Sequence, residues 1–272
     1  MPSVLRRSVA LVILGALVVI VACATVPITG RNQLTIIPDG QLYGMSFQQY
    51  DDVLAQAELS DDEQQVAMIR RVGRRIQDSV ERFMTERGHA DELDGYAWEF
   101  NLIESDQINA WCMPGGKVAF YTGILPVCDG EDGVAVVMGH EVAHAIAEHG
   151  NERMSQMLLT QLGGMALNEA LSSKPEQTQQ LAMTAFAVGA QYGVLLPYSR
   201  THESEADEMG LIFMAMAGYD PREAPRLWRR MAEAGGAQPP EFLSTHPSHE
   251  SRIENLNAHM DEADRKSTRL NS

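Results

Sequence analysis

Two histidines and a glutamate occur within five consecutive residues, in the order His140-Glu141-Val142-Ala143-His144. The residues around them are apolar, so this segment is predicted to be a helix packed into a core. Residues four apart lie on one face of a helix, and both imidazoles can therefore bind a single Zn²⁺ at about 2.0–2.1 Å. Glu141 lies beside them and is predicted to take a proton from metal-activated water, which is hydrolytic chemistry.

A catalytic zinc ion needs a third protein ligand, with the fourth position left for water. Glu203 is the candidate, in the sequence His202-Glu203-Ser204-Glu205-Ala206-Asp207. Asp207 lies one helical turn later on the same face and is predicted to accept the second ring N–H of a ligating histidine, His140. The alternative is a solvated acidic helix start, which the helix dipole also favours.

The motif pair resembles the HtpX-like, Oma-like and CAAX-prenyl-endopeptidase family of gluzincin zinc metallopeptidases, in particular its periplasmic lipoprotein branch. The resemblance covers most of residues 26 to 257. Besides the two motifs above, it rests on Val26-Pro27-Ile28-Thr29-Gly30-Arg31, on Asn109 to Lys117 (NAWCMPGGK), on Tyr198-Ser199-Arg200 and on Thr245 to Ile253 (THPSHESRI).

This resemblance implies a zincin-like metallopeptidase domain with one Zn²⁺ per chain. It also implies an endopeptidase that cleaves misfolded or misassembled cell-envelope proteins, with outer-membrane assembly machinery as a candidate partner. An edge strand beside the metal would pair with extended substrate. Either Asn109–Met113 or Ala119–Tyr121 would supply that strand, unless the segment is an ordinary internal hairpin. A different function is also open, that of a zinc-stabilised chaperone (holdase) for outer-membrane proteins.

Several further polar residues have weaker assignments. Arg200 or Tyr198 could stabilise the oxyanion of the reaction, or Arg200 could hold Glu203 or Asp207 in place. His246, in a proline-flanked loop, is either a regulatory fourth ligand that silences the enzyme or plain polar surface. His149 is interpreted as a helix-end residue off the ligand face, and His202 and Glu205 as surface residues.

The N-terminus has the features of an export signal. Arg6 and Arg7 precede the uncharged apolar run from Val9 to Ala22, the layout of a signal peptide. The run ends in Ile20-Val21-Ala22-Cys23, which resembles a bacterial lipobox, and Cys23 is the predicted lipidation site. Residues 1–23 are therefore predicted to be a lipoprotein signal, with the mature chain in the bacterial periplasm and anchored to the outer membrane. An uncleaved membrane anchor is the alternative.

Cys112 and Cys128 are the two cysteines that follow. In an oxidising compartment they could form a disulfide that stabilises the fold by roughly 3 kcal/mol. Otherwise they are two small buried residues that do not meet.

The rest of the chain predicts an α+β fold, mainly helical with a small sheet. Residues 24–40, with two prolines and two glycines, are predicted to be an extended tether, and residues 41–263 to be the metallopeptidase domain. Within that domain, residues 176–198 between Pro175 and Pro197 are expected to cover the cleft. Residues 264–272 (DRKSTRLNS) read as a translated sequencing adapter or a disordered tail, the alternative being an ordinary polar C-terminus.

The charge balance excludes one class of partner. The formal net charge is −16, with 21 Lys and Arg against 37 Asp and Glu. A phosphate backbone would be repelled on average, so nucleic-acid binding is not expected.

Overall fold

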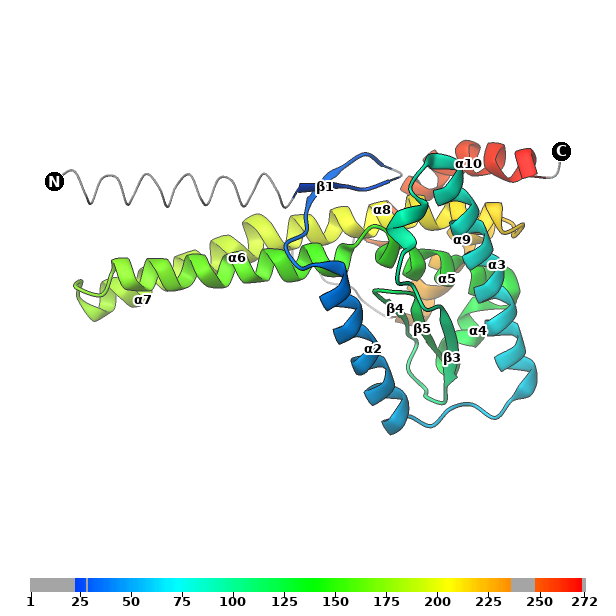
Figure 1. Cartoon of the computed structure of the whole chain (residues 1–272), viewed down its shortest axis with the longest axis horizontal. Helices are drawn as coiled ribbons and strands as arrows, with labels where there is room; N and C mark the ends of the chain where they lie inside the picture. Colours follow the sequence, from blue (N-terminus) through cyan, green and yellow to red (C-terminus); the bar gives the residue numbers. More distant parts are fainter. Residues whose placement is uncertain (1–22, 28, 236–247, 271–272) are drawn as a thin grey trace.

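The structure is a computed structural model that describes residues 23–27, 29–235 and 248–270. Figure 1 shows a body built from helices and a small sheet, with one long helical hairpin projecting from it. The predicted fold class, mainly helical with a small sheet, is confirmed. Residues 1–22 lie outside the described part of the chain, so the signal-peptide prediction stays a prediction.

Two helices and a three-stranded sheet form one side of the body. The helices are α2 (Asp39–Gln56) and α3 (Glu63–Arg87). The strands are β3 (Glu99–Ile103), β4 (Ala110–Met113) and β5 (Lys117–Tyr121), in the order β3-β5-β4. β5 pairs with β3 in parallel and with β4 antiparallel, so β4 is an edge strand and β5 is central. Of the two candidate edge segments, the structure therefore places Asn109–Met113 at the edge and Ala119–Tyr121 inside.

Helix α3 illustrates how local sequence sets an element. The Asp62 carboxylate accepts hydrogen bonds from the backbone N–H groups of Gln64 and Gln65, which caps the helix start. The helix ends at Gly88, whose φ of 78° is the left-handed conformation that glycine adopts without strain. Between these ends, one stripe of the helix is buried in the core: Ile69, Val72, Ile76, Val80 and Phe83.

Further helices complete the body, and α3 packs against them as well as on β3. Three short helical turns precede them: η1 (Ala90–Leu93), η2 (Thr122–Ile124) and α4 (Leu125–Cys128). Helix α5 (Glu131–Ile146) then packs on β4 and crosses α8 (Leu196–Met216). Helices α9 (Glu223–Gly235) and α10 (His249–Leu270) cover α8 and α5. Both α5 and α8 are largely buried, α5 through its near-continuous apolar sequence and α8 through its second half, residues 209–216.

Helices α5 and α8 cross at two glycines. A methyl group built on Gly139 would lie 2.7 Å from the carbonyl oxygen of Gly210, and one on Gly210 would lie 2.7 Å from the backbone nitrogen of His140. Any side chain at either position would force the helices apart. The pair therefore sets the close approach that brings the histidines of α5 to the acidic residues of α8.

The projecting hairpin consists of α6 (His149–Ala170) and α7 (Glu176–Ala190), which continues through the π-helical turn η3 (Gln191–Leu195) into α8. Pro197 lies in the first turn of α8, directly after the π-helical turn, a position where proline is tolerated. The prediction that residues 176–198 cover the cleft is wrong, because this segment extends away from the body (Figure 1).

The predicted tether is also wrong in part, because it packs on the body. β1 (Cys23–Thr25) and β2 (Asn32–Leu34) form an antiparallel hairpin, and Val26 is fully buried. The backbone N–H of Ile36 then donates to Ser155 of α6 at 2.9 Å. At the other end, α10 continues through the predicted tail boundary at residue 263, and Asp264 forms an ion pair with Arg222.

Candidate metal centre

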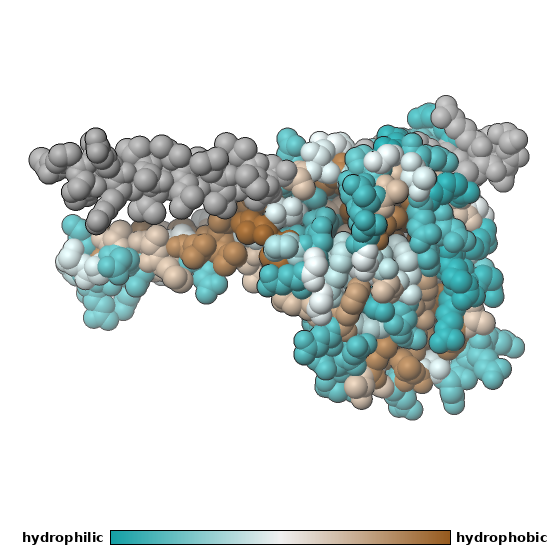
Figure 2. Space-filling model, in the orientation of Figure 1, coloured by the Kyte–Doolittle hydropathy of each residue, from teal (hydrophilic) through white to brown (hydrophobic). Residues whose placement is uncertain are grey.

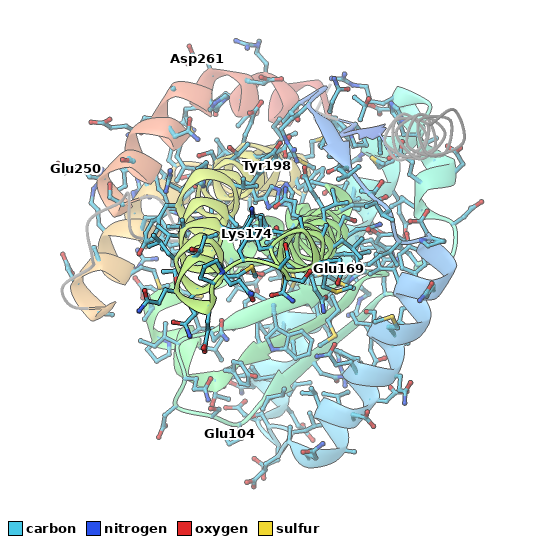
Figure 3. The ribbon with its side chains drawn as sticks, turned by 90° about the vertical axis from the view of Figure 1, so that its left-hand side faces the viewer. Glu104, Glu169, Lys174, Tyr198, Glu250 and Asp261 are labelled. Atoms are coloured by element: carbon cyan, nitrogen blue, oxygen red, sulfur yellow. The ribbon has the colours of Figure 1, made fainter. Side chains whose placement is uncertain are left out.

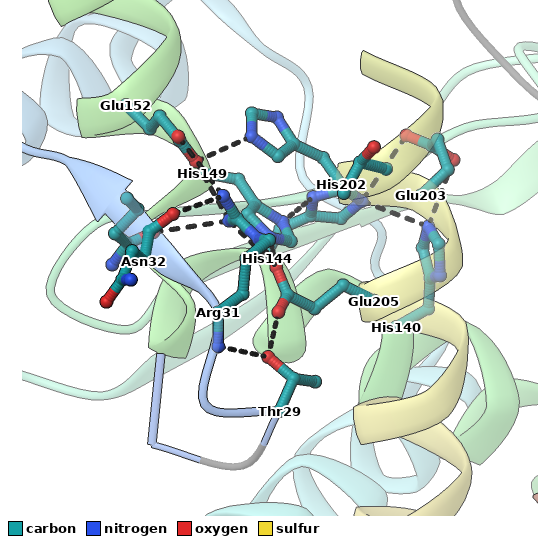
Figure 4. Close-up of polar contacts among 12 residues, drawn as sticks. Thr29, Arg31, Asn32, His140, His144, His149, Glu152, His202, Glu203 and Glu205 are labelled. Carbon is teal, nitrogen blue, oxygen red and sulfur yellow. Dashed lines mark hydrogen bonds and ion pairs between the residues drawn. The ribbon is translucent and has the colours of Figure 1, made fainter. Parts of the chain in front are cut away.

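Three side chains from two helices meet at one point. The Nε2 atoms of His140 and His144 on α5 lie 3.1 Å apart, and carboxylate oxygens of Glu203 on α8 lie 3.6 and 3.5 Å from them. Four ligands arranged tetrahedrally at zinc distances of about 2.0–2.1 Å would be about 3.3 Å from one another. The three predicted ligands therefore have the spacing that a zinc ion requires, and they form a group able to hold a metal (Figure 4).

The orientation of the His140 ring is fixed by contacts on the side opposite the metal position. Its Nδ1 atom lies 3.0 Å from the Asp207 carboxylate, so the N–H is on Nδ1 and the lone pair of Nε2 faces the metal position. Asp207 thus has the contact that its spacing from Glu203 predicts. Arg252 of α10 donates to Asp207 at 2.8 Å and to Glu203 at 3.2 Å. Its guanidinium also stacks 3.4 Å from the ring centroid of Trp228.

His144 is oriented by a second histidine. Its Nδ1 atom lies 2.8 Å from Nδ1 of His149, and Nε2 of His149 lies 2.9 Å from the Glu205 carboxylate. Because Glu205 accepts the proton on Nε2, His149 accepts at Nδ1 the N–H of His144. The lone pair on Nε2 of His144 is then free for the metal. Both histidines therefore present the same nitrogen, in the required tautomer, to one point.

The assignments of His202 and Glu205 to the surface are wrong, whereas His149 does lie at a helix end, as the first residue of α6. All three are buried, in a polar cluster with Glu152 and Arg31 (Figure 4). Arg31 forms ion pairs of 2.8 Å with both Glu152 and Glu205, Glu152 accepts from His202 at 2.8 Å, and Thr29 donates to Glu205. The segment around Arg31 thus supports the metal centre through Glu205 and His149.

The electrostatics of the three ligands suit a cation. Burial lowers the pKa of His144 to about 3, so its imidazole is neutral and ready to bind metal. Burial and Arg252 also act to lower the pKa of His140, but the hydrogen bonds to Asp207 and Glu203 outweigh them and raise it to about 9. Without a metal, the carboxylates therefore keep a proton on His140 that a divalent cation would displace.

Glu141 lies on the side of α5 that faces the edge strand. Burial, and then the charge of Glu141, raises the pKa of the Cys112 thiol on β4. Cys112 and Met113 line a cleft together with His144 and Tyr43 of α2. One metal ligand and the edge strand thus border the same cleft, and the charge of Glu141 acts on Cys112 of that strand.

The structure places the remaining predicted site residues as follows. Tyr198 is exposed, and its ring lies 6.3 Å from that of His202. Arg200 lines a surface pocket that also includes Glu205 and Arg252. Arg252, which had no assigned role, contacts Glu203 and Asp207 directly. His246 lies outside the described residues, and so does the side chain of Cys23.

The two later cysteines do not pair in the structure. Cys112 lies on β4 and Cys128 is buried at the end of α4, and both thiols are free. The structure therefore agrees with the alternative of two separate small residues, and the stabilising disulfide is not part of this fold.

Residues 71–260 match peptidase family M48. The chain belongs to this family. The match spans α5, α8 and α10, which carry all three candidate ligands, Glu141, Asp207 and Arg252. The expected class, a zincin-like metallopeptidase, is therefore confirmed at the level of the family, and the donor set fits the zinc that such a peptidase uses. The lipoprotein branch of the resemblance gains no support from the match.

Several relatives of this M48 chain are mitochondrial by name. Mitochondrial metalloendopeptidase OMA1 of Schizosaccharomyces pombe is 39% identical over 168 residues, which cover 61% of this chain and 48% of the relative. The protein of the same name in Saccharomyces cerevisiae is 35% identical, covering 63% and 49%. The beta-barrel assembly-enhancing protease of Escherichia coli is 30% identical, covering 57% and 33%. The chain spans about half the length or less of these relatives.

These relatives overturn one prediction. A bacterial periplasmic location, with an anchor in the outer membrane, was expected from the N-terminal sequence alone. The relatives with the higher identities are mitochondrial proteins by name, which contradicts this prediction. The apolar run and Cys23 do not distinguish a bacterial from a mitochondrial location, since an apolar segment is compatible with several membranes.

The glycine crossing of this M48 domain gives a direct test of the helix geometry. Replacing Gly210 with alanine should destabilise the fold by about 1–3 kcal/mol, because the added methyl group overlaps the backbone of α5. It should also weaken zinc binding, since Glu203 moves away from His140 and His144. Urea unfolding and competition with a chromophoric chelator measure the two effects.

A matched alanine variant shows whether the effect is local. Gly189 is also helical, but it lies in the projecting hairpin and nothing is within 4 Å of a methyl group built there. Gly189→Ala should leave zinc binding unchanged and stabilise the fold by about 0.4–1 kcal/mol. Equal effects of the two substitutions would contradict the role given to the crossing.

Proposed function

We propose that this chain is a zinc-dependent endopeptidase that cleaves extended segments of misfolded or misassembled proteins. The observation that carries the proposal is the convergence of two imidazole Nε2 atoms and the Glu203 carboxylate at zinc spacing, with Glu141 on the adjacent helix position. Membership of peptidase family M48 supports peptide-bond hydrolysis as the reaction.

The chain's own residues have separate tasks in this reaction. Zinc in such a site supplies Lewis acidity to the scissile carbonyl and to a water molecule. His140, His144 and Glu203 hold it, and Asp207 and His149 fix the tautomers of the two histidines. Glu141 takes a proton from the attacking water and then gives that proton to the leaving amine.

The edge strand supports an extended substrate. β4 has one free edge in the described sheet and borders the cleft that contains His144. A peptide added to this edge would bind through its backbone, so many side chains would be tolerated. Such recognition requires a segment that is not already folded, which favours misfolded proteins over native ones.

The quality-control role is supported by the names of relatives only. The bacterial relatives are called beta-barrel assembly-enhancing proteases, which favours misassembled membrane or envelope proteins as substrates. The OMA1 relatives are called metalloendopeptidases, which favours internal cleavage.

Cleavage of an unfolded protein tests the proposal. Purified full-length chain should cleave β-casein and leave a compact folded protein of similar size intact. 1,10-Phenanthroline should stop cleavage, and added zinc should restore it, because the ion is required for the reaction. Equal cleavage of both proteins would contradict the substrate class, and chelator-resistant cleavage would contradict the zinc mechanism.

A second function has one structural observation in its favour. The projecting hairpin exposes many apolar side chains, as a zinc-stabilised chaperone (holdase) would need for binding unfolded proteins. The two functions differ in their need for Glu141, since a chaperone does not require a base beside the metal.

A further inference from the structure

The surface of the α6–α7 hairpin is unusually apolar. Among the described residues, thirteen large apolar side chains are exposed, and ten of them lie between Met157 and Tyr198. Figure 2 shows a brown zone on the hairpin next to the body, with a hydrophilic tip beyond it. The ten exposed residues are Met157, Leu158, Leu159, Leu162, Met165, Leu181, Val188, Tyr192, Val194 and Tyr198.

Both arms of the hairpin also lack charge on every face. No charged residue occurs in residues 154–168 of the first arm or in residues 177–199 of the second. The charged groups lie at the ends: Arg153 and Arg200 at the base, and Glu169, Lys174 and Glu176 at the tip, where Figure 3 shows Glu169 and Lys174. A surface helix in water normally has one charged or polar face. Here the polar residues within both arms are all uncharged, among them Gln161, Gln179 and Gln180.

The second arm has the dimensions of a membrane segment. Its 23 uncharged residues extend about 35 Å as a helix, against about 30 Å for the hydrocarbon core of a bilayer. It belongs to the helical segment Glu176–Met216, which is long and apolar enough to cross a membrane by length and composition, with only 6% of its most apolar window buried in the structure. The first arm, at about 22 Å, reaches a large part of that depth.

We propose that the charge-free part of the α6–α7 hairpin inserts into a lipid bilayer. Leu181, Val188 and Tyr192 recur at i, i+7 and i+11 and present one apolar stripe, and Arg153 and Arg200 at the base lie where they can meet lipid headgroups. The tyrosines 192 and 198 lie near the same base, as aromatic residues do at a membrane interface.

The N-terminal sequence favours lipid over a protein partner. The apolar run Val9–Ala22 joins the described structure at Cys23, the first residue of β1. β2 packs at the hairpin base, where Asn32–Leu34 line a groove with Leu159, Val194 and Tyr198. Cys23 pairs with Leu34, so the point at which the apolar run joins the structure lies beside the hairpin base, as it would if both apolar segments met a single membrane surface.

Insertion would bring the metal centre close to the lipid. Glu203 lies four residues beyond Ser199, the last uncharged residue of the second arm, which is about 6 Å along the helix axis. Substrates would then be segments near the membrane surface. This consequence rests on the proposed peptidase function, whereas insertion itself does not.

Quenching by brominated lipids tests insertion without any activity measurement. Full-length Val188→Trp is reconstituted into phosphatidylcholine–phosphatidylglycerol vesicles that contain dibromo-phosphatidylcholine. The native tryptophans 98, 111 and 228 all lie in the body and provide the background. The brominated lipid should quench at least half of the fluorescence that Val188→Trp adds to this background. The control is Asp78→Trp, an exposed position on α3 of the body, and the fluorescence that it adds should be quenched no more than the native background is.

A second variant tests whether the apolar stripe causes the effect. Adding Leu181→Lys and Tyr192→Lys to Val188→Trp should abolish the extra quenching while the N-terminal run still holds the protein on the vesicles. Two results would overturn the proposal. One is vesicle-bound Val188→Trp without extra quenching. The other is a blue shift, in the absence of lipid, of the emission of the introduced tryptophan as the protein concentration rises. That shift would mean that a second copy of the chain, and not lipid, covers the apolar stripe.

Discussion

Replacing Glu141 with glutamine should abolish peptide-bond cleavage while leaving zinc bound. The amide has nearly the shape of the carboxylate but cannot accept the proton of the attacking water, so kcat should fall by about 10²–10⁴-fold. His140, His144 and Glu203 are unchanged, and Asp207 and His149 still orient the histidines. The rate of casein cleavage and the zinc content, measured on the same preparation, test the loss of activity and the retention of zinc.

A carboxylate elsewhere on α5 provides the control. Glu131, in the first turn of the helix, forms an exposed ion pair with Arg71, and Glu131→Gln should cleave casein at the wild-type rate. The same pair of variants separates the peptidase from the chaperone. If Glu141→Gln suppresses aggregation of an unfolded protein as well as the wild type does, and the wild type cleaves nothing, the holdase function is correct and the peptidase proposal fails.

Replacing Arg252 with methionine should cost the fold about 3–5 kcal/mol in the absence of metal. Arg252 is 5% exposed and donates to both Asp207 and Glu203. Its loss leaves one buried negative charge without a partner, because protonated His140 neutralises only one of the two carboxylates. Asp207 would also lose its fixed position behind His140. Zinc affinity should therefore fall by about 10–100-fold, as it does when groups behind a metal ligand are removed.

Two variants show that the effect belongs to this position. Arg252→Lys keeps the charge but not the planar fork that reaches both carboxylates, so it should recover only part of the loss. Arg226→Met removes an arginine of α9 whose side chain is 55% exposed, beside Glu223, and should change stability by no more than about 1 kcal/mol. Urea unfolding of the metal-free proteins measures all three. An Arg252→Met protein as stable as Arg226→Met would contradict the role given to Arg252.

The three ligands could be predicted because their geometry is local. His140 and His144 are one turn apart on a helix, and so are Glu203 and Asp207, so sequence spacing alone places each pair on one face. The apolar surroundings of the histidines predict that α5 is buried, whereas the polar residues around Glu203 give no such signal for the first half of α8. Only the crossing of the two helices had to be assumed, and the contact between Gly139 and Gly210 provides it.

The support behind the ligands could not be predicted because it depends on turns and distant segments. Glu148 adopts a left-handed conformation with φ of 51°, which ends α5 and redirects His149 towards His144, whereas a continuous helix would place it off the ligand face. Arg252 reaches the centre from a helix 49 residues beyond Glu203. Both Arg31 and Arg252 lie in segments that carry the family resemblance, which was the one signal for them in the sequence.

Zinc content is the most direct measure of whether side chains from α5 and α8 share one ion. Inductively coupled plasma mass spectrometry of the purified wild type should find one zinc per chain, and the same value for Glu233→Ala, a surface carboxylate of α9. Glu203→Ala should retain only a small fraction of that zinc after dialysis, because two imidazoles alone bind it weakly. A Glu203→Ala protein that keeps one zinc per chain, or a wild type that binds none, would contradict the metal centre described for this protein.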